Sequence, residues 1–292
     1  FKFYLQTKHI SNSTSSYFKL NCYLCATNKI FNMSTIIYPS PIFGPIKSRR
    51  LGLSLGINLL PSDGKVCTFD CIYCECGFNK DHRTKSIFPT RQAVAIKLEE
   101  KLKEMTKTGE YPDVLTFAGN GEPTSNPEFA EIIDDTIRLR NQYCPNAKVS
   151  VLSNSTFIHR PKVFDALLKV DNNILKLDTI NDAYIQNTDR PVIPSYSAAK
   201  IIEGMKAFKG KLIIQTMFMK GTSQDGIDVN NVKEEYISPW LAALKTIAPR
   251  KVMIYTIDRE TPDPNLKKAT KEELNTICER VKAMGISCSA SY

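Results

Sequence analysis

The chain has 292 residues, of which 42% are hydrophobic and 24% charged, and its formal net charge is +9. This composition is ordinary for a globular protein with one large domain or two small ones. No apolar run approaches the ~20 residues that span a bilayer. The odd count of 9 cysteines argues against a secreted disulfide scaffold. We therefore expect a cytoplasmic protein with reduced thiols and no membrane-spanning helix.

The first 32 residues differ from the rest of the chain in composition. They contain lysines but no acidic residue, and no helical or strand period persists in them. The continuous apolar segment and cleavage site of a signal peptide are not evident. Because Met33 resembles a natural start, we expect residues 1–32 to be a non-native or disordered leader and residues 33–292 to form the functional domain.

A short segment contains three cysteines, Cys67, Cys71 and Cys74, separated by three and then two residues. Thiolates are the soft ligands of iron–sulfur clusters and of zinc. A complete cube or a structural zinc takes four ligands, so either one metal position stays open or the fourth ligand is distant. Cys76 is a candidate fourth ligand, although only one residue separates it from Cys74. A zinc ribbon would need a second Cys-x-x-Cys pair, and the other such pair lies in the leader.

Helical and strand-like hydrophobic patterns alternate from residue 89 onward. Short apolar strands are expected at residues 113–118, 148–152, 174–178, 212–218 and 252–257. Helices are expected to begin near Thr90, at Asn126, near Phe164, near Ala198, at Ser238 and at the capping box of Thr270. With a first strand before the cysteines, six βα units indicate an α/β fold with a parallel sheet and outer helices. The pattern alone fits an open sheet or a barrel, and both place a site at the carboxyl ends of the strands.

The cysteine segment, with Tyr73 at its aromatic position, resembles the Cys-x-x-x-Cys-x-aromatic-Cys signature of radical S-adenosylmethionine (SAM) enzymes. In that superfamily three cysteines hold a [4Fe–4S] cluster, the open iron binds the methionine group of SAM, and the aromatic residue lies beside the adenine. The resemblance therefore implies Cys67, Cys71 and Cys74 as metal ligands and a partial (β/α)6 TIM-type barrel over residues 33–292. The earlier segment from Gly44 to Gly56 resembles an uncharacterised subgroup related to the enzymes that form the wyosine base of tRNA.

Two glycines and an acid follow the second predicted strand, in the segment Gly119, Asn120, Gly121 and Glu122. Glycines allow a ligand to approach the backbone closely. The segment resembles the Gly-Gly-Glu motif that binds the methionine ammonium in the superfamily, with Asn120 in place of the first glycine, so the resemblance implies cofactor binding. Without the cysteines, the same residues would indicate a plain turn with a capping acid.

Further polar residues follow the third, fourth and fifth predicted strands. Ser153 and Asn154 suit a ribose or a carboxylate of SAM, and an ordinary Asn/Ser turn is the alternative. Asp178 is expected to accept hydrogen bonds from ribose hydroxyls and to act in catalysis. It shares a strand face with Lys176, so a simple Lys–Asp pair is the alternative. Gln215 is expected to point inward toward SAM.

The last candidates, Asp258 and Arg259, follow the sixth predicted strand. An arginine fork at the barrel mouth suits a carboxylate or phosphate of the substrate, so both are candidate catalytic residues. An Asp–Arg pair that braces the loop is the alternative. The basic cluster of Lys47, Arg49 and Arg50 is also able to meet phosphates, but a solvated basic surface is the commoner explanation.

The resemblance implies an oxidoreductase-type enzyme that cleaves SAM reductively at a [4Fe–4S] cluster. The resulting 5′-deoxyadenosyl radical abstracts hydrogen from a substrate that stays open between a tRNA base, a protein or peptide, and a small metabolite. A low-potential reductant such as flavodoxin or ferredoxin is the implied partner. The alternative from another class is a non-catalytic iron–sulfur electron-transfer protein in which Cys76 completes the ligand set. The remaining thiols Cys144, Cys278 and Cys288 are expected in the core.

Overall fold

The computed structural model describes residues 35–48, 50–81 and 83–292. The predicted leader, residues 1–32, lies outside this range. In the part of the chain that is described, no helix is both long enough and apolar enough to cross a membrane.

One sheet of eight strands forms the centre of the domain, in the order β1-β2-β3-β4-β5-β6-β8-β10. β1 pairs antiparallel with β2, and each later neighbour pairs in parallel. A second, two-stranded sheet pairs β7 with β9. The strands are β1 (Ile42–Ser48), β2 (Gly52–Ile57), β3 (Val114–Phe117), β4 (Lys148–Ser153), β5 (Asn172–Lys176), β6 (Ile213–Met217), β7 (Met219–Gly221), β8 (Lys251–Tyr255), β9 (Leu266–Lys268) and β10 (Ser287–Ser291).

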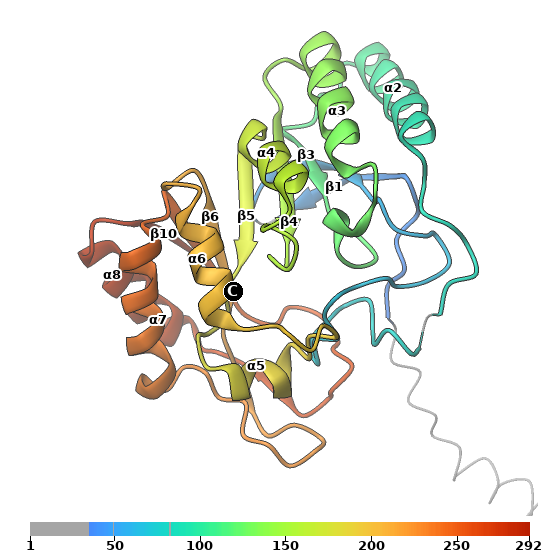
Figure 1. Ribbon diagram of the computed structural model, residues 1–292. Coiled ribbons are helices and arrows are strands. Elements are labelled where there is room, and N and C mark those ends of the chain that lie inside the picture. The colour runs from blue at the N-terminus through green and yellow to red at the C-terminus, as the bar shows by residue number, and fades with distance from the viewer. Residues whose placement is uncertain (1–34, 49, 82) are drawn as a thin grey trace, which may run out of the picture. The chain divides into compact units, whose positions relative to one another are not determined.

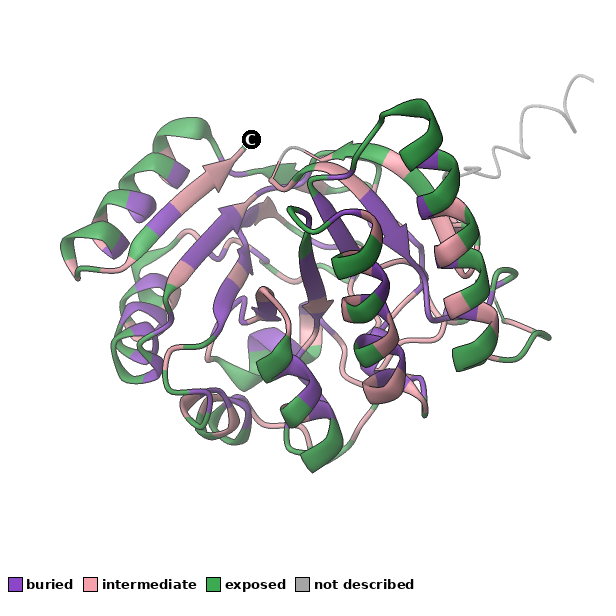
Figure 2. Cartoon of the chain, turned by 90° about the horizontal axis from the view of Figure 1, so that it is seen from above, coloured by how far each residue is buried: buried purple, intermediate pink, exposed green. Residues whose placement is uncertain are grey.

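All the helices except α5, which lies at the carboxyl ends of the strands, cover the outer, convex side of this curled sheet (Figure 1). Seen from above, their inward faces are buried and their outward faces exposed (Figure 2). The helices are α2 (Arg91–Thr108), α3 (Phe129–Tyr143), α4 (Pro161–Lys169), α5 (Asp182–Thr188), α6 (Ala198–Lys206), α7 (Glu234–Ile247) and α8 (Lys271–Ala283), with a 3-10 turn at Pro123–Ser125. The predicted α/β partial barrel of six βα units is confirmed, and β1 and β10 extend it at its two edges.

Local sequence accounts for the limits of the outer helices, as α2 illustrates. The hydroxyl of Thr90 accepts a hydrogen bond from the backbone N–H of Ala93, as an N-cap does. The helix ends at Gly109, whose φ of 74° favours glycine. The buried stripe of the helix consists of Val94, Leu98, Leu102 and Met105, as its period predicts. Burial of this stripe against the sheet therefore fixes the orientation of α2.

Three local predictions differ from the structure. The prediction that a helix begins at Ser238 is wrong, because α7 begins at Glu234 and contains Pro239 in its interior. The helix predicted from Asn126 begins at Phe129, although the Asn126 side chain accepts a hydrogen bond from the Glu128 N–H in the manner of a cap. The short helix α5 was absent from the sequence prediction, and it lies beside the candidate site described next.

Candidate active site

The cysteine segment lies at the carboxyl ends of the strands, held there by backbone hydrogen bonds from the end of α5. The N–H of Ile72 donates to the carbonyl of Thr188 at 2.9 Å, and the N–H of Asp70 donates to the carbonyl of Asp189 at 2.9 Å. On the other side, the N–H of Val66 donates to the carbonyl of Asn120 at 2.9 Å. These contacts fix the backbone that carries the three thiols.

The sulfur of Cys67 receives two N–H groups from the protein. The backbone N–H of Phe69 lies 3.4 Å from it and the side-chain amide of Asn154 lies 3.6 Å from it. Hydrogen bonds of this kind stabilise thiolate charge on cluster ligands. Burial raises the pKa of the Cys67 and Cys71 thiols above the usual value, so their charged form needs a metal or a nearby cation.

Such a cation is Lys65, whose side chain is 1% exposed. Its ammonium donates to the carbonyl of Gly77 at 2.6 Å and lies 3.4 Å from the carboxylate of Asp70. Burial opposes its charge, but the thiolates of Cys74, Cys67 and Cys71 raise the pKa of Lys65 above its usual value. The sequence analysis did not single out this lysine, because its position under the cysteines depends on how the segment folds.

The three thiols of this segment are the candidate ligands of a metal group. In the described ranges, no three His, Cys, Asp or Glu side chains converge on the position of one metal ion. Thiolates bound to separate irons of a cube stand farther apart than the ligands of one ion. Three half-buried soft donors on one loop, with N–H groups and an ammonium beside them, therefore fit attachment to an iron–sulfur cluster.

The nearby Cys76 is buried, on the side toward the β3 loop. Its sulfur lies 3.5 Å from the carbonyl of Gly119. A hydrogen bond from its thiol lowers the pKa of Cys74 to about 6. The single S–H of Cys76 donates either to the Cys74 sulfur or to the carbonyl of Gly119.

The two glycines of the β3 loop permit close contact with protein groups. A Cβ at Gly121, where φ is 137°, would lie 1.9 Å from the carbonyl oxygen of Val66, next to the first cysteine. A Cβ at Gly119 would lie 2.6 Å from the side chain of Asn58. The side chain of Asn120 pairs with both the N–H and the carbonyl of Tyr38, at 2.7 and 2.9 Å. The residue that departs from the family motif thus anchors the segment before β1.

Glu122 connects this loop with the loop after β4. It is 1% exposed, and its carboxylate accepts hydrogen bonds from the Ser153 hydroxyl at 3.0 Å and from the Asn154 N–H at 2.6 Å. Burial raises the pKa of Glu122, while hydrogen bonds from Thr124 and Asn154 oppose the shift. The structure therefore brings together three residues that the sequence analysis placed at separate strand ends.

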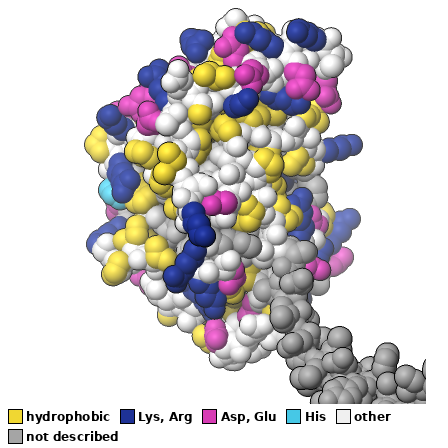
Figure 3. All heavy atoms as spheres, turned by 90° about the vertical axis from the view of Figure 1, so that its right-hand side faces the viewer, with side chains coloured by type: hydrophobic (Ala, Val, Ile, Leu, Met, Phe, Trp, Pro, Cys, Tyr) yellow, Lys and Arg dark blue, Asp and Glu magenta, His cyan; other side chains and the backbone are white. Residues whose placement is uncertain are grey.

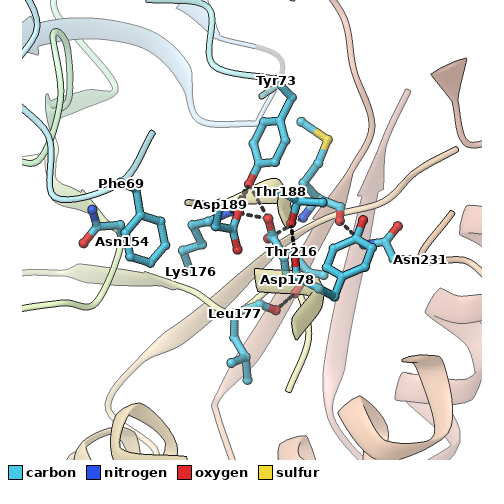
Figure 4. Close-up of polar contacts among 12 residues, drawn as sticks. Phe69, Tyr73, Asn154, Lys176, Leu177, Asp178, Thr188, Asp189, Thr216 and Asn231 are labelled. Atoms are coloured by element: carbon cyan, nitrogen blue, oxygen red, sulfur yellow. Dashed lines mark hydrogen bonds and ion pairs between the residues drawn. The ribbon is translucent and has the colours of Figure 1, made fainter. Parts of the chain in front are cut away.

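A buried polar cluster, formed by Tyr73, Lys176, Asp178 and Asp189, lies beside the cysteine segment (Figure 4). The Tyr73 hydroxyl donates to Asp178 and to Asp189, the latter at 2.9 Å. The Lys176 ammonium forms ion pairs with Asp178 and with Asp189, the latter at 3.1 Å. The second oxygen of Asp178 accepts from the Met217 N–H at 2.9 Å. Both oxygens of Asp178 are therefore engaged by the protein, and the Lys176–Asp178 pair weighed in the sequence analysis is present.

Asp189 is a site residue that sequence reasoning missed. It is 2% exposed at the end of α5, and burial raises its pKa to about 7 against the opposing effect of Lys176. An acid that follows a short, weakly periodic helix gives no distinctive sequence signal. Its contact with Tyr73 joins residues separated by 116 positions.

The candidates after β8 are Asp258 and Arg259. Arg259 donates to Glu75 at 2.8 Å and to the Tyr38 hydroxyl at 3.0 Å, so it pairs with the cysteine segment. Asp258 lies 4.0 Å from Lys268. The structure thus places Arg259 near the predicted site but with a different acidic partner from the one considered.

A cavity of about 520 Å³ connects these groups inside the curl of the sheet. Its wall includes Cys71, Cys74, Tyr73, Gly119 and Lys176. This volume is typical of a small-molecule site. We call this space the lumen. Its position at the carboxyl ends of parallel strands is where ligands bind in such folds.

Comparison with known proteins agrees with this geometry. A "UPF0026 protein" of Helicobacter pylori (strain ATCC 700392 / 26695) is 34% identical over 239 residues, which cover 80% of this chain and 70% of the relative. The structure of Streptococcus suis SuiB bound to S-adenosylmethionine matches with a TM-score of 0.57 and 15% identity, covering 96% of this chain and 57% of SuiB.

A third similar protein is TYW1, solved with a lysine-pyruvate adduct bound. It matches with a TM-score of 0.54 and 14% identity, covering 79% of this chain and 73% of TYW1. Likeness at this level shows a common fold. The family model described as the Radical SAM superfamily matches residues 62–235. The chain therefore belongs to the radical SAM superfamily of enzymes.

Proposed function

We propose that Cys67, Cys71 and Cys74 hold a [4Fe–4S] cluster and that SAM binds against it in the lumen. A reduced cluster with bound SAM supplies a 5′-deoxyadenosyl radical, which abstracts hydrogen from a substrate. The observation that carries this proposal is the set of three half-buried thiols on one loop beside the lumen, with the Cys76 sulfur 3.5 Å from the carbonyl of Gly119. That set leaves the fourth ligand position to a molecule in the lumen.

The surrounding residues then have positioning roles. Tyr73 lines the lumen and is fixed through its hydroxyl by Asp178 and Asp189, so its ring is held where an adenine would lie. Glu122, with Ser153 at 3.0 Å, keeps the β3 and β4 loops at a fixed separation for the methionine and ribose groups. Asp178 thus acts through Tyr73 in this proposal. The buried wall of the lumen excludes water from the reacting groups.

The substrate and the electron donor belong to the same proposal. Flavodoxin or ferredoxin is the expected class of reductant, and a tRNA base is one candidate substrate. TYW1 holds a lysine-pyruvate adduct, whereas Lys176, which lines the lumen together with Lys47, is paired with two aspartates. Burial opposes its charge, but Asp178 and Asp189 raise the pKa of Lys176 well above its usual value. A protonated lysine is not a nucleophile, so this residue does not support that adduct.

One face of the surface gives a tRNA substrate little support. On the face drawn in Figure 3, Lys and Arg side chains are dispersed and interleaved with Asp and Glu. Three further cysteines, which a second cluster would need, are instead buried in the hydrophobic core: Cys144, Cys278 and Cys288. The expectation that these three are core thiols is confirmed.

Anaerobic reconstitution with iron and sulfide, followed by electron paramagnetic resonance, tests the proposal. We expect a reduced [4Fe–4S] signal that changes when SAM is added, and 5′-deoxyadenosine after reduction with dithionite. Cys71→Ala should lose the cluster, because two thiolates remain. Cys278→Ala, in the outer core, is the matched control and should retain it.

The behaviour of Cys76→Ala separates the enzyme from the electron-transfer alternative. If Cys76 is a donor to Cys74, the variant keeps four irons and its response to SAM. If Cys76 completes the ligand set, the variant loses iron, and SAM leaves the signal of the unmodified protein unchanged. That second pattern would contradict the proposal.

A further inference from the structure

The turn between β1 and β2 carries the Ser-Arg-Arg-Leu-Gly segment, for which the proposed function provides no role. The Ser48 hydroxyl accepts hydrogen bonds from the N–H groups of Arg50 and Leu51, at 3.3 and 3.2 Å. Gly52 has a φ of +80°, and a Cβ there would lie 2.4 Å from the carboxylate of Asp113. These contacts orient the described residues of the turn, Ser48, Arg50, Leu51 and Gly52.

Arg50 and Leu51 extend from the turn into the lumen at the amino ends of the strands. Leu51 packs against Ile174, Ile213 and Met253, which lie on β5, β6 and β8. The guanidinium carbon of Arg50 lies 4.7 Å from the centre of the Tyr255 ring. Arg50 therefore lines the lumen, where the sequence analysis expected a solvated basic surface.

The guanidinium of Arg50 has no counter-charge among the residues that the structure describes. Its Nη1 is buried and has no hydrogen-bond partner there. By contrast, the neighbouring cation Lys176 is neutralised by Asp178 and Asp189 (Figure 4). An unpaired buried guanidinium N–H is costly, so this arrangement is explained by an acceptor that arrives with a ligand.

The chemistry of that ligand follows from the groups around Arg50. A planar guanidinium stacked on an aromatic ring presents its edge, which matches one carboxylate. A phosphate dianion would bring two negative charges to one guanidinium, which supplies a single positive charge. Gln215 lies beside Tyr255, and its buried Oε1 also lacks a partner in the described structure, so it is ready to accept an N–H or O–H group.

We propose that Arg50 binds a carboxylate of the substrate inside the lumen, and that the substrate is a small carboxylic acid with a hydrogen-bond donor facing Gln215. This inference rests on the proposed function and specifies its substrate class. A tRNA base offers no carboxylate for Arg50 to bind, so the proposal selects a small metabolite over a nucleic acid as the substrate.

The test uses the reconstituted protein with its cluster and SAM. Small carboxylic acids (2-oxo acids, amino acids and hydroxy acids) are titrated at up to millimolar concentration while the melting temperature is recorded, alongside the corresponding amides and phosphate esters. We expect at least one acid to bind and its amide not to bind. Arg50→Gln should weaken that binding at least about tenfold, because one charge-assisted hydrogen bond is lost. Arg50→Lys, which keeps the charge but loses the fork, should give an intermediate loss.

Arg250→Gln is the matched control, since this arginine lies at the same end of the strands but donates to Asn172 at 3.0 Å. It should bind the acid as the unmodified protein does. Binding of phosphate esters alone, binding unchanged in Arg50→Gln, or no binding by any acid would overturn the proposal. The SAM-dependent change in the resonance signal is recorded for the unmodified protein and for Arg250→Gln, and it should be the same in both. If that change is absent from the unmodified protein, the proposed function fails instead.

Discussion

The two faces of the central sheet are made by alternate residues of the same strands, yet they differ in chemistry. On β3, Phe117 faces the outer helices and lies 6.2 Å from Phe129 in an edge-on arrangement. The preceding residue, Thr116, faces the lumen and shares a 2.7 Å hydrogen bond with Ser54. The outer face is closed by aliphatic and aromatic packing, while the lumen face combines polar groups with a smaller apolar cluster of Ile174, Ile213 and Met253. Stability therefore depends mainly on one face and binding on the other.

The largest expected effect is on the outer face. Phe117→Ala should lower the free energy of unfolding by about 3–5 kcal/mol, because it leaves a cavity in a fully buried cluster. Urea unfolding of the reconstituted protein measures it. The lumen-face control, Thr116→Val, should cost only about 1 kcal/mol, since it removes one hydrogen bond. Equal losses for the two variants would show that the faces do not differ in the way described.

Buried charge in the lumen gives the next effect. Lys176→Met should cost about 3 kcal/mol, because Asp178 and Asp189 then lose their counter-charge in a buried place. The matched variant on the outer surface is Arg280→Met, whose partner Glu234 is exposed and screened by water. We expect no measurable change in the unfolding midpoint there. A similar loss in both variants would argue against a special environment inside the lumen.

A smaller effect concerns the midpoint potential of the proposed cluster. Lys65→Met should lower the midpoint potential by on the order of 59 mV, a tenfold change in the reduction equilibrium, because a positive charge beside the thiolates stabilises the reduced state. Resonance-monitored redox titration measures the shift. Lys65→Arg keeps the charge and should stay close to the unmodified potential. A potential that is the same in Lys65→Met and Lys65→Arg would remove this role from the lysine.

The smallest effect is expected from an exposed pair on the outer helices. Hydrogen bonds from Arg280 and Ser238 lower the pKa of Glu234 to about 2. Because the folded pKa lies below the unfolded value of about 4.3, the stabilisation is present above that value and is lost as the pH falls toward 2. Glu234→Gln should remove this acid dependence and lower the melting temperature at neutral pH only slightly, because an exposed pair contributes little. If the melting temperature of Glu234→Gln falls with acid as it does in the unmodified protein, the lowered pKa of Glu234 is contradicted.

Much of the fold was predictable, since it depends on local hydrophobic period. The stripes of α2 and α8 and the apolar strands are patterns of neighbouring residues, and the capping box at Thr270 is present as predicted. The wrong start for α7 has a local cause as well. Pro239 was placed in the first turn because proline favours that position. The helix instead begins at Glu234, and burial of Ile237 and Trp240 favours the longer form.

The candidate site was predictable only in part. The cysteine spacing and the strand ends predicted that Glu122, Ser153 and Asn154 would lie together, and they do. The partners Asp189 and Arg50 depend on how a short helix and a turn dock against distant strands. Such contacts leave no periodic signal in the sequence. The specific roles of the predicted cofactor residues, Gln215 included, stay predictions for the variants above.

The turn that carries Arg50 enters the lumen from the end opposite the cysteines. The two ends of the lumen, one lined by Arg50 and the other next to the three cysteines, are thus formed by separate segments of the chain. Substitutions in this turn would then change which substrate binds, while the residues proposed to hold the cluster and SAM stay the same. Relatives with a common cysteine loop and different turns would accordingly be expected to serve different metabolic steps.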